Sequence, residues 1–221
     1  MRRFDPSLLP SEPDLQFEKR LWEIGLRHIA GIDEAGRGAL AGPVAAGVVI
    51  FPPDESSRAS LNGLRDSKQL TPAERNEWAV SVQETAITWA VAFASHDEID
   101  RLGIVPATRL AAQRALQACE HQAEHLLLDY LFLPDLDIPQ TKLVKGDQRS
   151  KSIAAASVLA KTARDALLVQ LNEEIPGYRF ADHKGYGTRG HLEALKRLGP
   201  SPIHRRSFAP LKDAGIIVKE H

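Results

Sequence analysis

Short apolar runs bounded by glycine and proline recur along the chain and predict β-strands. Residues 28–36 and 42–53 have the pattern of two consecutive strands, and the glycines between them predict a hairpin. Similar short runs occupy residues 87–95, 124–130 and 140–147. The pattern therefore predicts a sheet of about five strands.

Helical periodicity separates these strands. Thr71, Pro72 and Glu74 form a helix start, with an N-cap, a proline at the first helical position and a capping glutamate. Residues 105–119 repeat apolar side chains at spacings of three and four, which predicts an amphipathic helix. Residues 150–174 predict a long helix whose many alanines allow close packing against a sheet. Two shorter helices are predicted near residues 17–25 and 191–198.

The order of these elements indicates the fold class. Three strands first, and then helices alternating with strands, predict an α/β fold around one mixed sheet flanked by helices. A chain of 221 residues suits a single domain, residues 1–221. Within it we expect an N-terminal extension over residues 1–27 and a basic C-terminal segment of helix and loop over about residues 176–221.

Composition excludes two classes of protein, and the charge distribution adds a function class. The chain is 43% hydrophobic and 26% charged with a net charge of −1, which is ordinary for a globular protein and argues against a disordered or membrane protein. Residues 142–206 contain 13 Lys or Arg against 6 Asp or Glu, a net +7, whereas the remainder has 15 against 23, a net −8. This asymmetry favours a surface for an anionic polymer, and a basic but merely solvated surface is the alternative.

Cysteine use and targeting signals bear on location. Cys119 is the only cysteine, so no internal disulfide forms, which favours a reducing compartment. The N-terminus has no apolar run typical of a signal peptide, and no stretch reaches the ~18 apolar residues of a membrane helix. We expect a cytoplasmic protein without a membrane partner.

Acidic residues stand at the ends of the predicted strands. Asp33 and Glu34 end the first strand, where alternation sends their side chains to opposite faces unless the chain bends. Asp129 closes an apolar run, and Asp147 follows the last strand. Two carboxylates at ~5 Å repel by about 3 kcal/mol at an effective dielectric of about 20, so such a cluster needs a cation. All-oxygen ligands favour Mg²⁺ or Mn²⁺, in a two-metal site for phosphoryl displacement.

Asp165 is the alternative to Asp147 as the last carboxylate. A straight helix that begins near residue 150 carries Asp165 about 22 Å along its axis, at ~1.5 Å per residue. Paired metals lie only ~4 Å apart, so the two aspartates do not both serve as ligands. We prefer Asp147, and expect Asp165 to pair with Lys161 or to cap a neighbouring loop.

Several long motifs occur in series: GIDEAGRGALAGPV, DSKQL, LVKGDQRSKSIAAASVLAKTARD, HKGYGTRGH and SPIHRRSF. Over nearly its whole length the chain thereby resembles the bacterial ribonuclease HII family. The resemblance implies an RNase H-like fold and a single catalytic domain. It also implies hydrolysis of the RNA strand in RNA/DNA hybrids and nicking at ribonucleotides embedded in duplex DNA, leaving a 3′-hydroxyl and a 5′-phosphate. The metal-binding and catalytic carboxylates that it implies are Asp33, Glu34, Asp129 and Asp147.

One of these residues departs from the family's pattern. The family's third acid is usually followed by glycine, whereas Asp129 precedes Tyr130. Asp135 and Asp137 therefore remain alternatives for the third carboxylate. Both lie past Pro134 in a predicted loop, so we prefer Asp129.

The resemblance also implies residues that contact the substrate. The turn Gly36, Arg37 and Gly38 would read the ribose 2′-hydroxyl, because glycine lets the main chain approach a sugar and this hydroxyl distinguishes RNA from DNA. Tyr186 would stack on the next sugar and favour a deoxyribose there. The candidates for phosphate contacts, which position a duplex without reading its sequence, are Lys68, Lys184, Arg205 and Arg206.

Other functions stay open from the sequence alone. A noncatalytic nucleic-acid-binding module would use the same basic surface, although four acids near a phosphate backbone weaken binding unless a metal bridges them. Ribonuclease HIII is the nearest related activity, and a phosphohydrolase of small esters is a more distant alternative. No obligate protein partner is implied.

Overall fold

The computed structural model describes residues 9–54 and 60–212. The outermost parts of the predicted N-terminal extension and C-terminal segment, residues 1–8 and 213–221, lie outside the described residues. The strands are β1 (Ile29–Ala35), β2 (Val44–Ile50), β3 (Thr88–Ala94), β4 (His125–Asp129) and β5 (Gln140–Leu143). The α-helices are α1 (Gln16–Glu23), α3 (Pro72–Thr85), α4 (His96–Leu102), α5 (Ile104–Ala118), α6 (Lys151–Glu174), α7 (Phe180–His183) and α8 (Arg189–Leu198). Two short 3₁₀ helices are η2 (Ser67–Gln69) and η3 (Gly146–Gln148).

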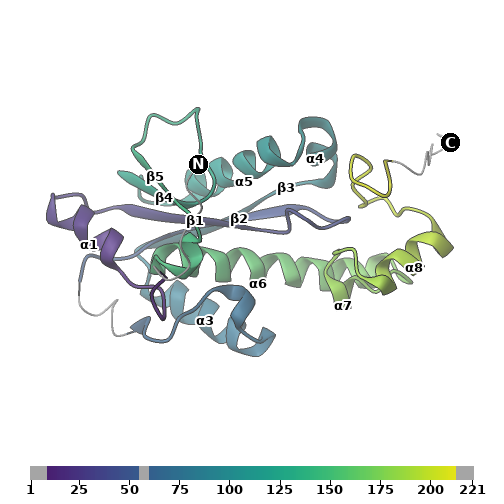
Figure 1. The fold of residues 1–221 in the computed structure, drawn as a ribbon, viewed down its shortest axis with the longest axis horizontal. Coiled ribbons are helices and arrows are strands. Elements are labelled where there is room, and N and C mark those ends of the chain that lie inside the picture. The colour runs from purple at the N-terminus through teal and green to yellow at the C-terminus, as the bar shows by residue number, and fades with distance from the viewer. Residues whose placement is uncertain (1–8, 55–59, 213–221) are drawn as a thin grey trace.

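The five strands form one mixed sheet in the order β3-β2-β1-β4-β5. The predicted hairpin is confirmed, because β1 pairs antiparallel with β2 and β2 pairs antiparallel with β3. The strands β4 and β5 continue the sheet in parallel beside β1. Figure 1 shows the sheet between two helical layers, with α5 and α4 on one face and α6 and α3 on the other. This arrangement confirms the predicted α/β fold with a mixed sheet flanked by helices.

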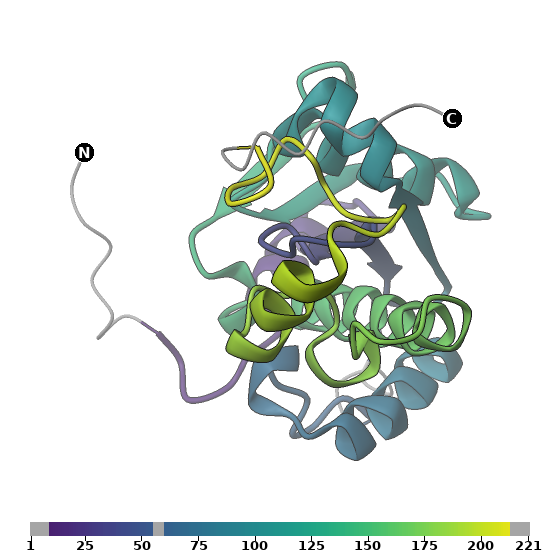
Figure 2. The ribbon, with the colours of Figure 1, turned by 90° about the vertical axis from the view of Figure 1, so that its right-hand side faces the viewer.

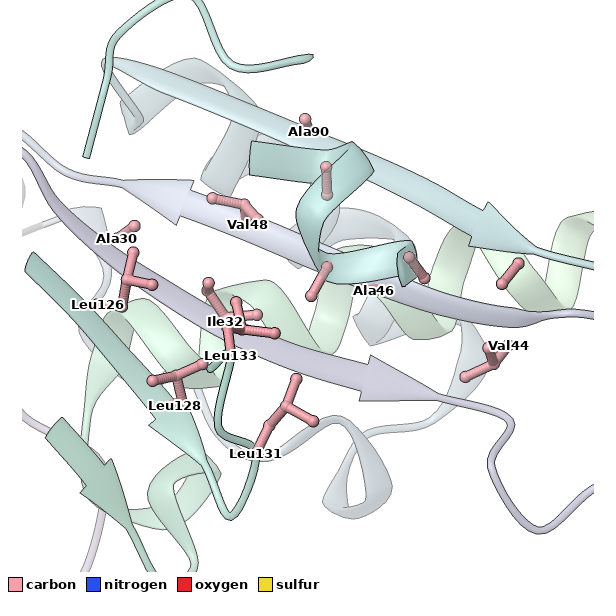
Figure 3. Close-up of a cluster of buried hydrophobic side chains, with 14 of the residues drawn as sticks. Ala30, Ile32, Val44, Ala46, Val48, Ala90, Leu126, Leu128, Leu131 and Leu133 are labelled. Atoms are coloured by element: carbon pink, nitrogen blue, oxygen red, sulfur yellow. The ribbon is translucent and has the colours of Figure 1, made fainter. Parts of the chain in front are cut away.

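Alternation along the strands divides the core between the two faces. Even-numbered residues of β1 and β2, such as Ile32 and Val48, are fully buried against α5, and Figure 3 shows them beside Leu126 and Leu128 of β4. Odd-numbered residues face the other way, where Val49 packs with side chains of α3 and α6. Burial on both faces explains why these strands are continuously apolar.

The long helix α6 lies unusually close to the sheet. A Cβ added to Gly31 of β1 would lie 2.2 Å from the carbonyl carbon of Ser152, and one added to Gly47 of β2 would lie 2.3 Å from the carbonyl oxygen of Ala156. Glycine on the strands and alanine on the helix therefore allow backbone to approach backbone. The close packing predicted from the alanine-rich sequence is confirmed, and it fixes α6 relative to the strand ends.

The structure adds elements that the sequence pattern did not predict. Helix α4 follows β3 directly and begins with a capping box in which Ser95 and Glu98 bond each other's main chain, a signal present in the sequence. The short helix α7 lies within the predicted glycine-rich loop. Across residues 9–54 and 60–212, no helix has both the length and the apolar character that crossing a membrane requires.

Candidate active site

Three carboxylates from separate parts of the chain meet beyond the end of β4. Asp33, Asp129 and Asp147 each offer one oxygen, and these oxygens lie within 4.8 Å of one another. Asp33 belongs to β1, Asp129 is the last residue of β4, and Asp147 lies in the 3₁₀ turn after β5. Because β1, β4 and β5 are parallel, their C-terminal ends lie at the same edge of the sheet. The predicted convergence of these three aspartates is therefore observed.

The register explains how Asp33 and Glu34 reach this edge. Pairing between β1 and β4 ends at Ile32 opposite Leu128, whereas β1 stays paired with β2 through Ala35. The chain therefore does not bend at the two acids. Asp33 lies on the face of the sheet that α6 covers, as Gly31 does, and Glu34 lies on the opposite face.

Asp129 is tied to the turn that carries Asp147. The main-chain N–H of Gly146 donates to Oδ1 of Asp129 at 2.8 Å. Tyr130 then adopts a left-handed backbone conformation with φ of 56°. Glycine adopts this conformation freely, whereas a bulky residue pays about 1–3 kcal/mol, so the family's usual glycine fits the geometry observed here. Among the described residues, Asp135 and Asp137 are not part of the carboxylate group.

Burial and mutual repulsion make the carboxylate cluster hold its protons more tightly than usual. Burial raises the pKa of Asp33 well above its ordinary value, and the charges of Glu34 and Asp129 raise it further. Burial also raises the pKa of Glu34 and of Asp147. Such groups are stabilised as carboxylates by a nearby cation.

Glu34 is close enough for its charge to act on Asp33 and Asp129, but it is not one of the three residues whose oxygens converge. Its Oε1 accepts from Nη1 of Arg37 at 2.9 Å. Its Oε2 is buried and has no hydrogen-bond partner in the described structure. A buried carboxylate oxygen without a partner is costly, and it points to a ligand that would complete the site.

The donor set fits hard divalent cations. All the atoms are carboxylate oxygens, which suit Mg²⁺ and Mn²⁺ rather than the Cys and His ligands that zinc favours. Two oxygens bound to one Mg²⁺ at about 2.1 Å lie at most about 4.2 Å apart. Oxygens that lie within 4.8 Å of one another therefore leave room for two metal ions, or would move slightly closer together to bind one ion. The unpartnered oxygen of Glu34 is a further potential ligand, so the carboxylates fit a metal site.

Lys68 reaches the cluster from η2. Its Nζ lies 3.0 Å from Oδ2 of Asp147 and 3.9 Å from Oδ1 of Asp66. Desolvation lowers the pKa of Lys68, but the charges of Asp147 and Asp66 outweigh it and raise the pKa above its usual value. The ammonium group therefore stays protonated beside the acids.

The glycine turn between β1 and β2 lies close to these acids. Gly36 has φ of 92°, and a Cβ at this position would lie 1.9 Å from Nε of Arg164, so only glycine fits. Gly38 is different, because no atom of the described residues lies within 4 Å of a Cβ placed there. The described part of the fold therefore does not require glycine at position 38.

Tyr186 lies over two cationic side chains. Its ring centroid is 5.5 Å from Nζ of Lys161 and 5.4 Å from Cζ of Arg164, distances at which cations attract an aromatic face. Its carbonyl accepts from Nδ1 of His191 at 2.9 Å. Tyr186 as a whole is partly exposed.

The predicted phosphate contact through the side chain of Arg205 is wrong. Arg205 is fully buried, and its guanidinium donates to the carbonyl oxygens of Gly36, Arg37 and Gly42 at 2.7–2.9 Å. A basic residue near a predicted site looks like a phosphate ligand in the sequence, but long-range packing turns this one inward. Arg206, its neighbour, is exposed, and its main-chain N–H donates to Asp100. Lys184 is partly exposed, and its Nζ donates to the carbonyl of Ala181.

Three further residues near the site were not singled out from the sequence. Asp66 in the DSKQL motif is buried and raises the pKa of Asp147. Ser157 of α6 hydrogen-bonds Asp33 and also contacts Ser67 at 2.9 Å. The third is Arg164, also on α6. All of these residues lie within the motifs quoted above: Asp66 and Ser67 belong to DSKQL, and Ser157 and Arg164 belong to the long motif of residues 143–165.

Asp165 lies away from the carboxylate group. Its carboxylate contacts Lys161 at 2.6 Å and Arg75 at 3.0 Å. The predicted pairing with Lys161 is confirmed, and Asp165 is absent from the group formed by the three aspartates.

Comparison with known proteins assigns the family. The sequence profile of the family described as Ribonuclease HII matches residues 30–211. A ribonuclease HII from Synechococcus sp. (strain JA-3-3Ab) is 52% identical over 202 residues, which cover 91% of this chain and 90% of that protein. A ribonuclease HII from Dehalococcoides mccartyi (strain ATCC BAA-2266 / KCTC 15142 / 195) is 49% identical and covers 88% of this chain.

Solved structures agree with the fold. Ribonuclease H2 from Pyrococcus horikoshii OT3 superposes with a TM-score of 0.68 at 25% identity, covering 84% of this chain and 95% of that chain. Bst-RNase HIII in complex with Mn²⁺ shares the fold with a TM-score of 0.61 at 20% identity, covering 87% of this chain and 70% of that one. The profile match and the sequence identities identify the HII branch rather than HIII or a noncatalytic binding module. The chain belongs to the ribonuclease HII family and is a metal-dependent endonuclease of the ribonuclease H type.

Proposed function

We propose that this enzyme hydrolyses the RNA strand of RNA/DNA hybrids and nicks duplex DNA beside an embedded ribonucleotide, leaving a 3′-hydroxyl and a 5′-phosphate. The observation that carries the proposal is the meeting of buried Asp33 and Asp147 with partly exposed Asp129 at the strand ends, beside a glycine turn that has open space at Gly38 among the described residues. A cytoplasmic location and a single catalytic domain remain predictions from the sequence.

In this proposal the carboxylates would hold two divalent ions, Mg²⁺ or Mn²⁺. Asp33, Asp129 and Asp147 would supply converging oxygens, and Glu34 would supply the buried oxygen that has no other partner among the described residues. Bound ions would supply activation of a water molecule and stabilisation of the leaving oxygen. The Nζ of Lys68, 3.0 Å from Asp147, brings a positive charge to where the scissile phosphate would bind.

The glycine turn reads the sugar. Gly36 is required by packing against Arg164, but no neighbour among residues 9–54 and 60–212 explains glycine at position 38. We infer that the missing side chain at position 38 gives a ribose room to approach the main chain, where its 2′-hydroxyl is recognised. Arg37, between them, is held by Glu34 at 2.9 Å, so the turn and the metal-binding acids are coupled.

Tyr186 selects the next sugar. Its partly exposed ring rests on Lys161 and Arg164, which fixes its plane. A deoxyribose stacks on that face without burying a hydroxyl, whereas a ribose would lose the hydration of its 2′-hydroxyl. We expect Tyr186→Ala to reduce cleavage at an RNA-to-DNA junction more than cleavage within a long RNA run.

The direct test is a DNA duplex that contains one ribonucleotide, incubated with Mg²⁺ or Mn²⁺. We expect a single nick at the ribonucleotide, a 3′-hydroxyl that a polymerase extends, and no cleavage of the all-DNA duplex. Binding of the duplex without a nick under either metal would contradict the proposal and favour a noncatalytic binding module. The remaining proposed phosphate contacts, Lys184 and Arg206, should mainly change the affinity for the duplex and its salt dependence.

A further inference from the structure

Arg164 is a fully buried arginine that bonds the two segments proposed to read the substrate. It lies on α6, and its guanidinium donates to the carbonyl oxygens of Pro43 at 2.9 Å and Ala41 at 3.1 Å, just after the glycine turn. The same guanidinium donates at 2.9 Å to the carbonyl of Lys184, two residues before Tyr186. One side chain therefore bridges the turn of residues 36–43 and the loop of residues 184–188.

Contacts beyond hydrogen bonds strengthen this bridge. The guanidinium carbon lies 5.4 Å from the centroid of the Tyr186 ring. The main chain of Gly36 also packs so tightly on Arg164 that a Cβ there would lie 1.9 Å from Nε. The planar guanidinium thus touches the glycine turn and the aromatic ring at the same time.

The charge of Arg164 lacks an anionic partner. No ion pair involves it among the described residues, and its nearest carboxylate in sequence, Asp165, is already bonded to Lys161 and Arg75. All three of its hydrogen bonds go to neutral carbonyl groups. A buried cation held only by carbonyls is costly for folding, so its value lies in the arrangement that it imposes.

Arg205 supports the same turn from a separate segment. It is also fully buried, and it donates to the carbonyls of Gly36, Arg37 and Gly42. Figure 2 shows the C-terminal segment, in yellow, crossing the end of the sheet where this turn lies, and an isolated bridge joins Ala41 to His204. Carbonyl groups of residues 36–43 thus accept hydrogen bonds from two arginines, which restrains the conformation of the turn. Of the two arginines, only Arg164 also bonds the loop that carries Tyr186. There it adds to one main-chain bond, from the N–H of Leu40 in the turn to the carbonyl of Gly185 at 2.8 Å.

We propose that Arg164 is a positioning residue that sets the distance between the glycine turn and Tyr186, and thereby sets the preference for a ribose followed by a deoxyribose. The inference rests on the proposed function, in which these two elements contact adjacent sugars. Arg164 touches no reacting atom. It acts by holding both elements in register with two consecutive nucleotides.

The test compares Arg164→Lys with the unchanged chain on two substrates, a duplex with one ribonucleotide and a duplex with a long RNA run. Lysine keeps the charge but has one donor group, which does not reach all three carbonyls. We expect kcat/KM on the single ribonucleotide to fall about 10- to 100-fold, as for a displacement of about 1 Å, with a much smaller loss on the RNA run. An unchanged ratio between the substrates would overturn the inference.

A double-mutant comparison separates positioning from general destabilisation. If Arg164 acts through Tyr186, the variant with both Arg164→Lys and Tyr186→Ala should have the substrate ratio of Tyr186→Ala alone. Losses in the ratio that multiply would show that the two residues act independently, against the inference. Val82→Ala is the matched control, because it creates a cavity where α3 packs against α6 and the sheet. It should lower the melting temperature without changing the ratio between the substrates.

A measurement on the unchanged chain keeps the inference testable if Arg164→Lys does not fold, and it needs no substrate. Native-state hydrogen exchange should show residues 39–42 and 184–188 opening with the same free energy, because one guanidinium bonds both segments and the N–H of Leu40 donates to the carbonyl of Gly185. Distinct opening free energies would overturn the inference. Absence of nicking by the unchanged chain would instead refute the proposed function. The exchange measurement does not depend on nicking, so it separates failure of the inference from failure of the proposed function.

Discussion

At the scale of single residues, the site is defined by charges that the fold brings together at a cost. Asp33 is buried beside Asp129 and Asp147, and its raised pKa reflects first burial and then the neighbouring acids. Close acidic oxygens destabilise the folded state unless protons or cations neutralise them. Binding of metal should therefore stabilise the protein and activate it through the same groups.

Asp33→Asn tests this directly. We expect cleavage to fall by about 10³-fold or more, since the loss of a metal ligand removes several kcal/mol of transition-state stabilisation. The metal-free variant should melt at the same temperature as the unchanged chain or higher, because one repelling charge is gone. It should also lose most of the rise in melting temperature that Mn²⁺ gives the unchanged chain.

Asp135→Asn is the matched control for this variant. Asp135 lies in the loop after β4 and is outside the carboxylate group, so its variant should keep cleavage and the response to Mn²⁺. Near-normal turnover by Asp33→Asn, or loss of activity in Asp135→Asn instead, would remove Asp33 from the proposed site.

The buried histidines give a pH dependence with a definite sign. The N–H of Ser201 donates to Nδ1 of His204 at 2.9 Å, which leaves Nε2 of His204 to donate to Nε2 of His191 at 3.0 Å. His191 then donates from Nδ1 to the carbonyl of Tyr186. This chain of bonds assigns both rings as neutral, so an added proton disrupts it.

Burial, and next the repulsion that His191 would exert if it were protonated, lower the pKa of His204 to about 4 from its usual value of 6.5. Because the unfolded chain binds the proton more tightly, stability is full above about pH 6.5 and is lost as the pH falls toward 4, by on the order of 3 kcal/mol. Between pH 8 and pH 4.5, the melting temperature of His204→Gln should therefore fall less steeply than that of the unchanged chain. His121 is exposed, so His121→Gln should keep the pH dependence of the unchanged chain. The same pH dependence of the melting temperature in all three proteins would refute the assignment.

At the scale of elements, much of the fold follows from local pattern. The glycines between β1 and β2 predicted the hairpin, and the spacing and small side chains of residues 150–174 predicted both α6 and its close packing. The cap at Thr71 predicted the start of α3, where the capping box is observed. The pattern did not predict helix α4, although Ser95 and Glu98 form its capping box. The apolar run of residues 87–95 that ends at this box predicts a strand.

The site was less predictable than the elements, for a physical reason. Strand ends revealed Asp33, Asp129 and Asp147, since parallel strands collect their ends at one edge. The burial of Arg164 and Arg205 depends on contacts with residues more than 100 positions away in sequence. Arg164, for example, bonds the carbonyl of Pro43, which lies 121 positions before it. Periodicity carries no information on such contacts. A buried arginine therefore looks in sequence like a surface one.

The contact between β1 and α6 gives a prediction at this scale. Gly31→Ala would force a Cβ to 2.2 Å from the main chain of Ser152, so α6 must shift away from the sheet. We expect a loss of about 1–3 kcal/mol in the free energy of unfolding, measured by urea denaturation. Stabilisation by Mn²⁺ should also weaken, because Asp147 lies just before α6.

Gly190→Ala is the control for this substitution. Nothing lies within 4 Å of a Cβ at position 190, which is in the first turn of α8. It should leave stability unchanged or raise it by up to about 1 kcal/mol. Equal stability of Gly31→Ala and the unchanged chain would show that the helix does not depend on this close approach.

At the scale of the whole molecule, the fold separates two tasks. The sheet and α6 position the acids, whereas we propose that the turn after β1, the loop before α8 and the C-terminal segment contact the nucleic acid. The basic residues of the second half of the chain offset the acids of the first half, which suits a duplex that must approach a negatively charged centre. Both tasks depend on the acids binding cations.

That dependence is tested most directly by anomalous X-ray diffraction from a crystal of the full chain soaked in Mn²⁺. The account predicts anomalous peaks within about 2.0–2.4 Å of carboxylate oxygens from Asp33, Glu34, Asp129 and Asp147, with none at Asp135 or Asp137. Strong Mn²⁺ peaks elsewhere, with none between Asp33, Asp129 and Asp147, would contradict it.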